Sequence, residues 1–176
     1  LNLPNEASIA RVLGSDVDPD RIHAVRIELI EAVVGEIGEV LRAAYDDRAS
    51  SAPYSPAAAQ AGNRALRLAA LGLLVRGGSK DAPALAARQY REATNMTDRF
   101  GALGIMVTTW TNDAAALLAA FRTQYGDDPL VFDKWLALSA APPQNETLER
   151  VRAILAEPDF PSNNPNRLRA LIGSFA

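Results

Sequence analysis

The sequence predicts an all-α protein, an α-superhelical, HEAT-like stack of about nine helices in antiparallel pairs. Apolar residues recur at three- and four-residue steps along most of the chain, as in amphipathic helices. Helix-start signals recur at intervals of roughly 15–25 residues from Ser55 onward, and two such helices match the length of a HEAT-like repeat, about 40–47 residues. No stretch alternates as a half-buried strand does. A compact helical bundle is the alternative architecture.

The first long helix is predicted from Pro19 to Asp46. Asp18-Pro19 combines an N-cap residue with a proline in the first turn. Gly35 and Gly38 each cost up to about 1 kcal/mol relative to alanine, so we interpret them as points where another helix backbone comes close. The stripe expected to face the core consists of Ile22, Val25, Leu29, Val33, Ile37, Val40 and Ala44.

The next helix is predicted from Pro56 to Val75, with Ser55-Pro56 as its start signal. The segment ALRLAALGLLV is apolar nearly all round, which predicts a buried inner helix. The segment RGGS should end this helix, and a further helix is expected from about Ala82 to Ala93.

Two helices follow in the middle of the chain. Asn95 or Thr97 should be the N-cap of the first, with Asp98 favourable in its first turn. The segment TND should start the second. The residues expected to face the core are Phe100, Leu103, Val107 and Trp110 in the first helix and Leu117, Ala120 and Phe121 in the second.

The last three helices should begin at Asp128-Pro129, at Asn145 and at Asn164-Pro165. Pro142-Pro143 should break the first of them, in which Asp133 and Lys134 should face solvent. The residues expected in the core are Trp135, like Trp110, then Leu148, Val151 and Leu155, and finally Leu168, Leu171, Ile172 and Phe175.

Composition excludes several classes of function. The 176 residues carry a formal net charge of −3, which argues against a nucleic-acid partner and against a basic membrane patch. There is no cysteine for a disulfide or a thiolate metal site. No apolar run approaches the roughly 20 residues that span a bilayer. The start, LNLPNEASIARVLG, lacks a signal-peptide pattern and an initiating methionine, which suggests a piece of a longer chain.

Catalytic motifs are missing from the sequence. His23 is the only histidine, so no H-E-x-x-H zinc motif is possible, and a structural or surface role is expected for it. The segment RGGSK lacks the glycine spacing of a phosphate-binding loop. The acidic segments DPDR and YGDDP do not match calcium-loop spacing and are better explained as helix caps.

The segment SNNPNRLR places three amides and two arginines at one helix start. Helix N-termini carry free N–H groups and a partial positive charge, so Asn166, Arg167 and Arg169 form a candidate site for carboxylates. The alternative is an ordinary N-cap with exposed arginines or intramolecular ion pairs. The residues alone leave both explanations open.

Three stretches resemble a known family. REATNMTDRFGAL, DPLVFDKWLALSAAPPQNETLERVRAILAEPDF and PSNNPNRLRALIGSFA are similar, in order and spacing, to the C-terminal helical region of bacterial aminopeptidase N (alanyl aminopeptidase), a gluzincin zinc metallopeptidase family. The resemblance covers most of the chain and is most specific from Asn95 to Phe175. Asn95, Met96, Thr97 and Asp98 match a family motif, which we interpret as a helix cap.

The resemblance implies that residues 1–176 form a single helical domain, an incomplete C-terminal domain of a larger multidomain aminopeptidase. The family's zinc ligands and its G-A-M-E-N segment are absent from this sequence. No catalytic residue, metal or cofactor is therefore expected in this fragment, whereas the parent enzyme uses zinc. The implied partners are the catalytic domain of the same chain and peptide substrates, with no nucleic acid and no membrane, and the implied location is cytoplasmic.

The implied function is non-catalytic. In the family this domain caps the active site and shapes the substrate cavity, so Arg169, Arg167 and Asn166 are expected to meet the carboxylate or backbone of a bound peptide. The alternative is a free-standing α-solenoid adaptor that binds a peptide or protein in its concave face. An enzyme in its own right is a weaker third possibility, because no nucleophile or paired histidine stands out.

Overall fold

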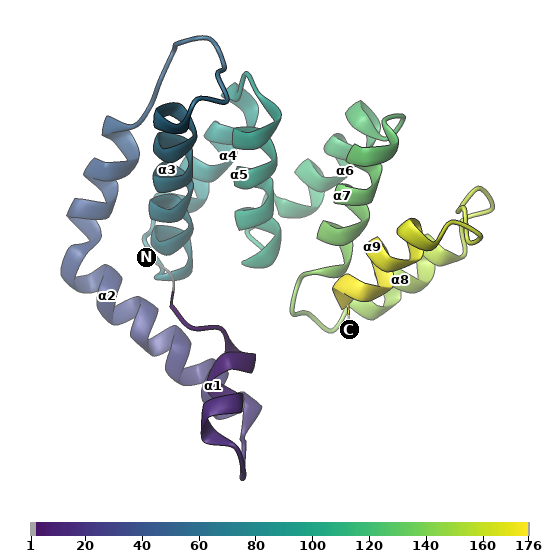
Figure 1. The fold of residues 1–176 in the computed structure, drawn as a ribbon, viewed down its shortest axis with the longest axis horizontal. Helices are drawn as coiled ribbons and strands as arrows, with labels where there is room; N and C mark the ends of the chain where they lie inside the picture. The colour runs from purple at the N-terminus through teal and green to yellow at the C-terminus, as the bar shows by residue number, and fades with distance from the viewer. Residues whose placement is uncertain (1–2, 176) are drawn as a thin grey trace. The chain divides into compact units, whose positions relative to one another are not determined.

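The structure is a computed structural model that describes residues 3–175. Over these residues it contains nine α-helices and no strand, which confirms the all-α prediction (Figure 1). The chain divides into two compact units, residues 1–85 and 86–176, with the border inside the fourth helix. The prediction of a single domain stays a prediction. The helices are α1 (Glu6–Leu13), α2 (Pro19–Asp47), α3 (Ala58–Arg76), α4 (Ala82–Glu92), α5 (Met96–Thr108), α6 (Ala114–Tyr125), α7 (Pro129–Ala140), α8 (Thr147–Leu155) and α9 (Pro165–Phe175).

Helix α2 begins as predicted and bends in the middle. The Asp18 carboxylate accepts a hydrogen bond from the Arg21 N–H at 3.0 Å, so Asp18 is the N-cap. The helix is kinked at Ile37, whose φ of −121° and ψ of 18° are not helical. The interpretation of Gly35 and Gly38 as helix-crossing points is wrong. A Cβ on Gly35 would meet nothing within 4 Å, and one on Gly38 would meet only Val34 of the same helix. These glycines flank the kink, where a low helix propensity eases bending.

The buried face of α2 differs from the predicted stripe. Ile22 is buried as predicted, but Val25, Leu29 and Val40 are exposed, and the residues that are buried in their place are Ile30, Val34, Leu41 and Tyr45. Apolar residues occupy two adjacent faces of this helix, and α3 packs against one of them. The periodicity predicted the helix correctly, but it did not determine which of the two faces is covered.

Helix α3 is the inner helix that the sequence predicted. Residues 70–75 are all buried, and the helix ends at Gly77 and Gly78, with Gly78 at a φ of +75°. Its start was predicted two residues too early. The Ser55 hydroxyl accepts a hydrogen bond from the Ala57 N–H in the preceding turn, and no side chain caps α3 itself. The close approach between α2 and α3 lies at Gly77, where a Cβ would come within 2.4 Å of the Val34 side chain.

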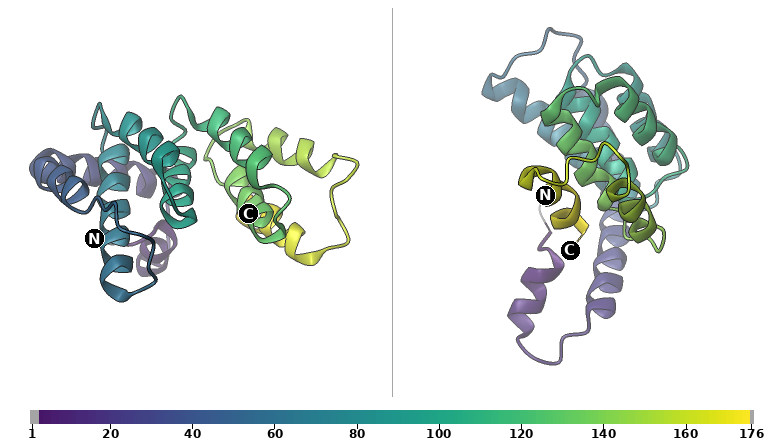
Figure 2. Two further views of the ribbon diagram at one scale, coloured as in Figure 1. Left: turned by 90° about the horizontal axis from the view of Figure 1, so that it is seen from above. Right: turned by 90° about the vertical axis from the view of Figure 1, so that its right-hand side faces the viewer.

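Helix α1 lies along the first half of α2, to which a tight connection joins it (Figures 1 and 2). No residue of α1 is buried, and polar contacts hold it in place. The Glu6 carboxylate contacts His23 Nδ1 at 2.8 Å and accepts a hydrogen bond from Arg26 at 3.1 Å. His23 is exposed, so its predicted structural or surface role is confirmed.

The second unit is built around α5 and α7. Asn95 Oδ1 accepts a hydrogen bond from the Asp98 N–H at 2.9 Å, which confirms Asn95 as the cap of α5. Asp128 caps α7 in the same way, with bonds from the N–H groups of Leu130 and Val131. The largest fully buried side chains of this unit are Phe121, Leu103, Met106, Leu136 and Leu171.

In three helices of this unit the predicted face is buried only in part, and Phe121, Val151 and Leu171 are the predicted residues that are buried. In α6 Leu118 is buried in place of the predicted Leu117, and the predicted Ala120 is exposed. In α8 the buried residues are Thr147, Val151 and Ile154, and the exposed ones are Leu148 and Leu155. In α9 Leu171 is buried, but Ile172 and Phe175 are exposed. Adjacent apolar residues differ by about 100° around a helix, and the neighbouring helices select one of them. The predicted cap Asn145 was also early, because Glu146 occupies the N-cap position.

Candidate functional site

The predicted arginine-bearing segment forms the start of α9. Asn164 Oδ1 accepts a hydrogen bond from the Asn166 N–H at 3.0 Å, and Pro165 is the first helical residue. This is the expected combination of a capping side chain and a proline. The helix then directs Arg167 and Arg169 into different surroundings, because residues two apart lie on different sides of a helix.

Arg167 is buried and holds α9 against α7. Its side chain is only 11% exposed, and its guanidinium donates to the Asp133 carboxylate and to the Pro129 carbonyl. The guanidinium carbon lies 5.0 Å from the centre of the Phe132 ring. The expectation that Asp133 faces solvent is wrong, because this part-buried ion pair turns its carboxylate toward α9. A peptide carboxylate would have to compete with Asp133 for Arg167.

Arg169 and Asn166 remain accessible. Both are exposed, and an Arg169 N–H donates to Asn166 Oδ1 at 3.5 Å. Among the described residues no carboxylate lies within ion-pair distance of Arg169. Of the three candidates, Arg169 and Asn166 therefore lie together at the surface, and Arg169 is the cation available to a ligand carboxylate.

A second ion pair joins α6 to the turn after α8. Arg122 donates to the Glu157 carboxylate, and its guanidinium carbon lies 4.4 Å from the Trp135 ring centre. The Arg122 hydrogen bond lowers the pKa of Glu157, and the carboxylate raises the pKa of Arg122. Trp135 itself is buried, as predicted. This cluster holds α6 to the turn after α8. No local sequence signal could have paired Arg122 with Glu157, which lies 35 residues later in the chain.

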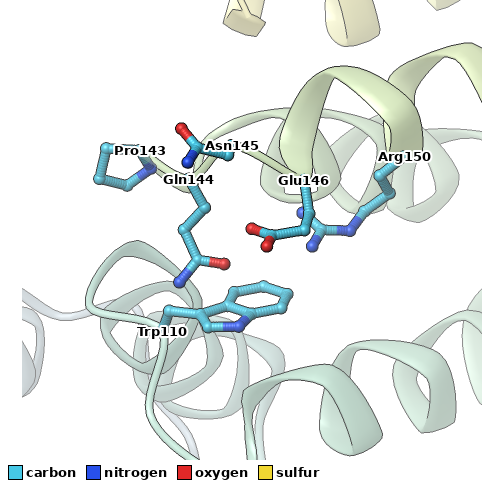
Figure 3. Close-up of a pocket in the computed structure, with 6 residues that line it drawn as sticks. All are labelled: Trp110, Pro143, Gln144, Asn145, Glu146 and Arg150. Atoms are coloured by element: carbon cyan, nitrogen blue, oxygen red, sulfur yellow. The ribbon is translucent and has the colours of Figure 1, made fainter.

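Sequence reasoning missed a pocket of about 510 Å³ in the second unit, shown in Figure 3. Trp110 forms one wall, and the turn before α8 with Arg150 forms the other. Figure 3 shows the Gln144 side chain extending toward the indole of Trp110. The lining residues are Trp110, Pro143, Gln144, Asn145, Glu146 and Arg150.

Trp110 was predicted on the buried stripe of a helix, and this is wrong. It follows the end of α5, has a φ of +47° and is half-buried. Its N–H donates to the Val107 carbonyl at 3.2 Å, and the Thr111 N–H donates to the Met106 carbonyl at 3.0 Å. This pair of bonds is a Schellman motif, in which the left-handed position is usually glycine. Tryptophan here moves its ring out of the core and toward the pocket.

Arg150 covers the indole. Its guanidinium carbon lies 4.3 Å from the Trp110 ring centre, a cation–π distance, and one N–H donates to the Ser139 carbonyl at 3.3 Å. Burial lowers the pKa of Arg150, and the nearby Glu146 carboxylate opposes this shift. The guanidinium therefore fixes the ring, and together with Glu146 it brings one charge of each sign to the pocket.

The structure offers no metal centre among residues 3–175. No group of three or more histidine, cysteine, aspartate or glutamate residues lies close enough to hold an ion there. The described residues thus do not fit a zinc ion like the one that the resemblance assigns to the parent enzyme. In the same part of the chain, no helix has both the length and the apolar character to cross a bilayer.

Comparison with known proteins gives the family. Residues 1–176 match the family described as "Domain of unknown function (DUF3458_C) ARM repeats". The chain belongs to this ARM-repeat domain family, and the repeat architecture supports the predicted α-superhelical stack over the compact bundle.

The similar proteins are aminopeptidases. Over its whole length the chain is 36% identical to aminopeptidase N of Caulobacter vibrioides and 35% identical to aminopeptidase N of Escherichia coli, and it spans 20% of each. Over 52% of its length it is 40% identical to aminopeptidase N of Haemophilus influenzae. These matches confirm the resemblance to the helical region of bacterial aminopeptidase N. The chain spans about one fifth of the first two relatives.

A solved structure shares the fold. Aminopeptidase A of Legionella pneumophila, crystallised in complex with aspartic acid, matches 99% of this chain with a TM-score of 0.85. The match covers 21% of that chain, at 21% sequence identity. At this level of identity the likeness bears on the fold alone.

Proposed function

We propose that this chain is the non-catalytic helical domain of a zinc aminopeptidase that removes N-terminal residues from peptides. The observation that carries the proposal is the 35–36% identity to two aminopeptidases N over the full 176 residues, with only 20% of each relative spanned. In this proposal the zinc and the catalytic residues belong to the catalytic domain of the same, longer chain. Its location is cytoplasmic.

The proposed role of the domain is to cap the active site and to shape the cavity that receives the substrate. An exposed cation at the surface of such a domain can bind the carboxylate of a peptide whose amino end is at the reaction centre. Arg169 has this exposure, and Asn166 supports it with an amide oxygen. Arg167 contributes by holding α9 on α7, so that Arg169 is presented from a fixed helix.

The experiment compares the native protein with the 176-residue chain. An antibody against the chain would capture the native protein from an extract of the source cells, and both samples would be tested with an alanine chromogenic amide. The native protein should release alanine, with loss of activity on metal chelation. The 176-residue chain should release none, even with added zinc. Robust release by the chain alone, or none by the captured protein, would reject the proposal.

A further inference from the structure

Trp110 is a non-glycine residue in a left-handed backbone conformation, at the position of a helix C-cap where glycine is usual. A non-glycine residue in the left-handed region costs about 1–3 kcal/mol, and glycine would end α5 without that cost. The indole is half-buried and is covered on one side by the Arg150 guanidinium, so part of its surface stays accessible. Strained residues of this kind are concentrated at binding sites, and this one forms a wall of the pocket.

The pocket offers uncommitted amide groups beside the aromatic ring. No hydrogen bond joins the side chain of Gln144 or of Asn145 to another described residue. A side-chain amide has both a donor and an acceptor, which match the N–H and the carbonyl of a peptide group. In Figure 3 the Gln144 amide lies next to the indole, and Asn145 lies at the rim.

The charge and the size of the pocket limit the class of ligand. Glu146 and Arg150 contribute one negative and one positive charge, so the pocket lacks the excess positive charge that a phosphate needs. The pocket has a volume of about 510 Å³ and is widely open to solvent, so it suits a segment that lies across it better than a small molecule that must be enclosed. A neutral polyamide segment of a few residues meets these limits.

We propose that this pocket, formed by Trp110, Arg150 and residues 143–146, binds an extended, uncharged peptide segment. The Gln144 amide forms hydrogen bonds with a backbone peptide group of the ligand, and the Trp110 indole contacts the adjoining side chain of the ligand. The inference rests on the proposed function in one respect, the choice of a peptide as ligand, to which it adds a binding position away from α9. In this proposal Arg150 holds the Trp110 indole in position.

A peptide blocked at both ends tests this inference separately from the proposed function. N-acetyl-Ala-Ala-Ser-Ala-Ala-amide has no free amino end for an aminopeptidase and no carboxylate for Arg169. Its binding is thus independent of catalysis, and a failure to bind would leave the aminopeptidase proposal untouched. Conversely, an inactive native protein would not affect the binding measurement.

The measurement is a titration followed by the two indole N–H signals in nitrogen–proton correlation spectra of the 176-residue chain. The sequence holds only Trp110 and Trp135, and the buried Trp135 serves as an internal reference. The Trp110 signal, assigned with Trp110→Phe, should shift with saturation, and the Trp135 signal should stay in place. Gln144→Ala should raise Kd about three- to tenfold, as expected for one lost hydrogen bond.

Gln124→Ala is the matched control, because it removes an exposed amide from α6 outside the pocket. It should leave Kd unchanged, and Gln144→Ala should unfold at the same temperature as wild type. No saturable shift of Trp110, equal shifts of both indoles, or wild-type affinity in Gln144→Ala would overturn the proposal. A Trp110 shift with sodium phosphate but not with the peptide would also overturn it, in favour of an anion site.

Discussion

At the scale of single residues, two backbone positions carry much of the local geometry. Trp110 holds a left-handed conformation that ends α5, and Gly77 leaves the space in which Val34 of α2 meets α3. Trp110 continues the apolar stripe of α5 in the sequence, but its backbone is not helical, and Gly77 lies outside any apolar stripe. Each can be tested by comparing glycine with alanine, since these residues differ by a single methyl group and by backbone freedom.

At position 110 the glycine variant should be more stable than the alanine variant, which is the reverse of the usual order within a helix. Both Trp110→Gly and Trp110→Ala lose the indole, but only glycine relieves the left-handed strain, so the glycine variant should be more stable by about 1 kcal/mol. Ala119→Gly in the exposed middle of α6 is the control, and there glycine should be less stable by about 0.5–1 kcal/mol. Urea unfolding measures both differences. Equal stability of the two Trp110 variants would contradict the assigned conformation.

Gly77→Ala should destabilise the first unit. The added Cβ would lie 2.4 Å from Val34 Cγ2 and 2.6 Å from Val34 Cβ, so the two helices must separate, at a cost of about 1–3 kcal/mol. Gly35→Ala is the matched control, because its Cβ would meet nothing and the helix propensity of α2 would rise. Thermal unfolding should show a lower midpoint for Gly77→Ala and an equal or higher one for Gly35→Ala. An unchanged unfolding midpoint for Gly77→Ala would mean that α2 and α3 lie farther apart at this point than the structure shows.

At the scale of helices, the pairing of α6 with the turn after α8 predicts a pH-dependent stability. Arg122 lowers the pKa of Glu157 below its ordinary value of 4.5. A carboxyl group with a lowered folded-state pKa stabilises the protein above its unfolded-state pKa, and this stability is lost as the pH falls through the folded-state value. The contribution of Glu157 should therefore be complete near neutral pH, begin to shrink near pH 4.5 and disappear only below the lower folded-state pKa.

The measurement compares wild type with Glu157→Gln by urea unfolding at several pH values between 7 and 3. The stability advantage of wild type should shrink toward zero as the pH falls, and it should remain modest because both side chains are about one third exposed. Glu149→Gln removes a more exposed pair within α8 and should have little effect at any pH. An advantage of wild type that stays constant down to pH 3 would exclude the ionised pair as its source.

The helices could be predicted from the sequence because their signals are local. Asp18, Asn95 and Asp128 cap helices through atoms two or three residues away, and periodicity is a property of one segment. The buried face could not be predicted where two adjacent positions are apolar. Val25 and Leu29 of α2 satisfy the same pattern as Ile30 and Val34, and only the packing of α3 decides between them.

The candidate site, like the fold, could be predicted from the sequence only where its signals are local. The start of α9 was recognisable from Asn164 and Pro165, and the exposure of Arg169 agrees with a surface cation. Arg167 is held by Asp133, 34 residues earlier in the chain, and no spacing rule relates the two. The pocket at Trp110 depends on the meeting of two distant turns, so periodicity misplaced this residue on a buried stripe.

At the scale of the whole molecule, the aminopeptidase proposal predicts a selective role for Arg169. In the longer enzyme, Arg169→Ala should lower kcat/KM for a tetrapeptide more than for a single-residue amide, since only the peptide presents a distant carboxylate. A loss of about tenfold for the peptide corresponds to one charge-assisted hydrogen bond of about 1.4 kcal/mol. Arg152→Ala on the exposed side of α8 is the control. Equal losses on both substrates would indicate a folding defect.

The central claim is that this domain works within a larger peptidase, and the mass of the native protein tests it most directly. An extract of the source cells would be separated by size and probed with an antibody against the 176-residue chain. The account predicts one band far above 18.8 kDa, the mass of the chain itself. A band near 18.8 kDa would contradict it and would favour a free-standing solenoid that binds its partner without a catalytic domain.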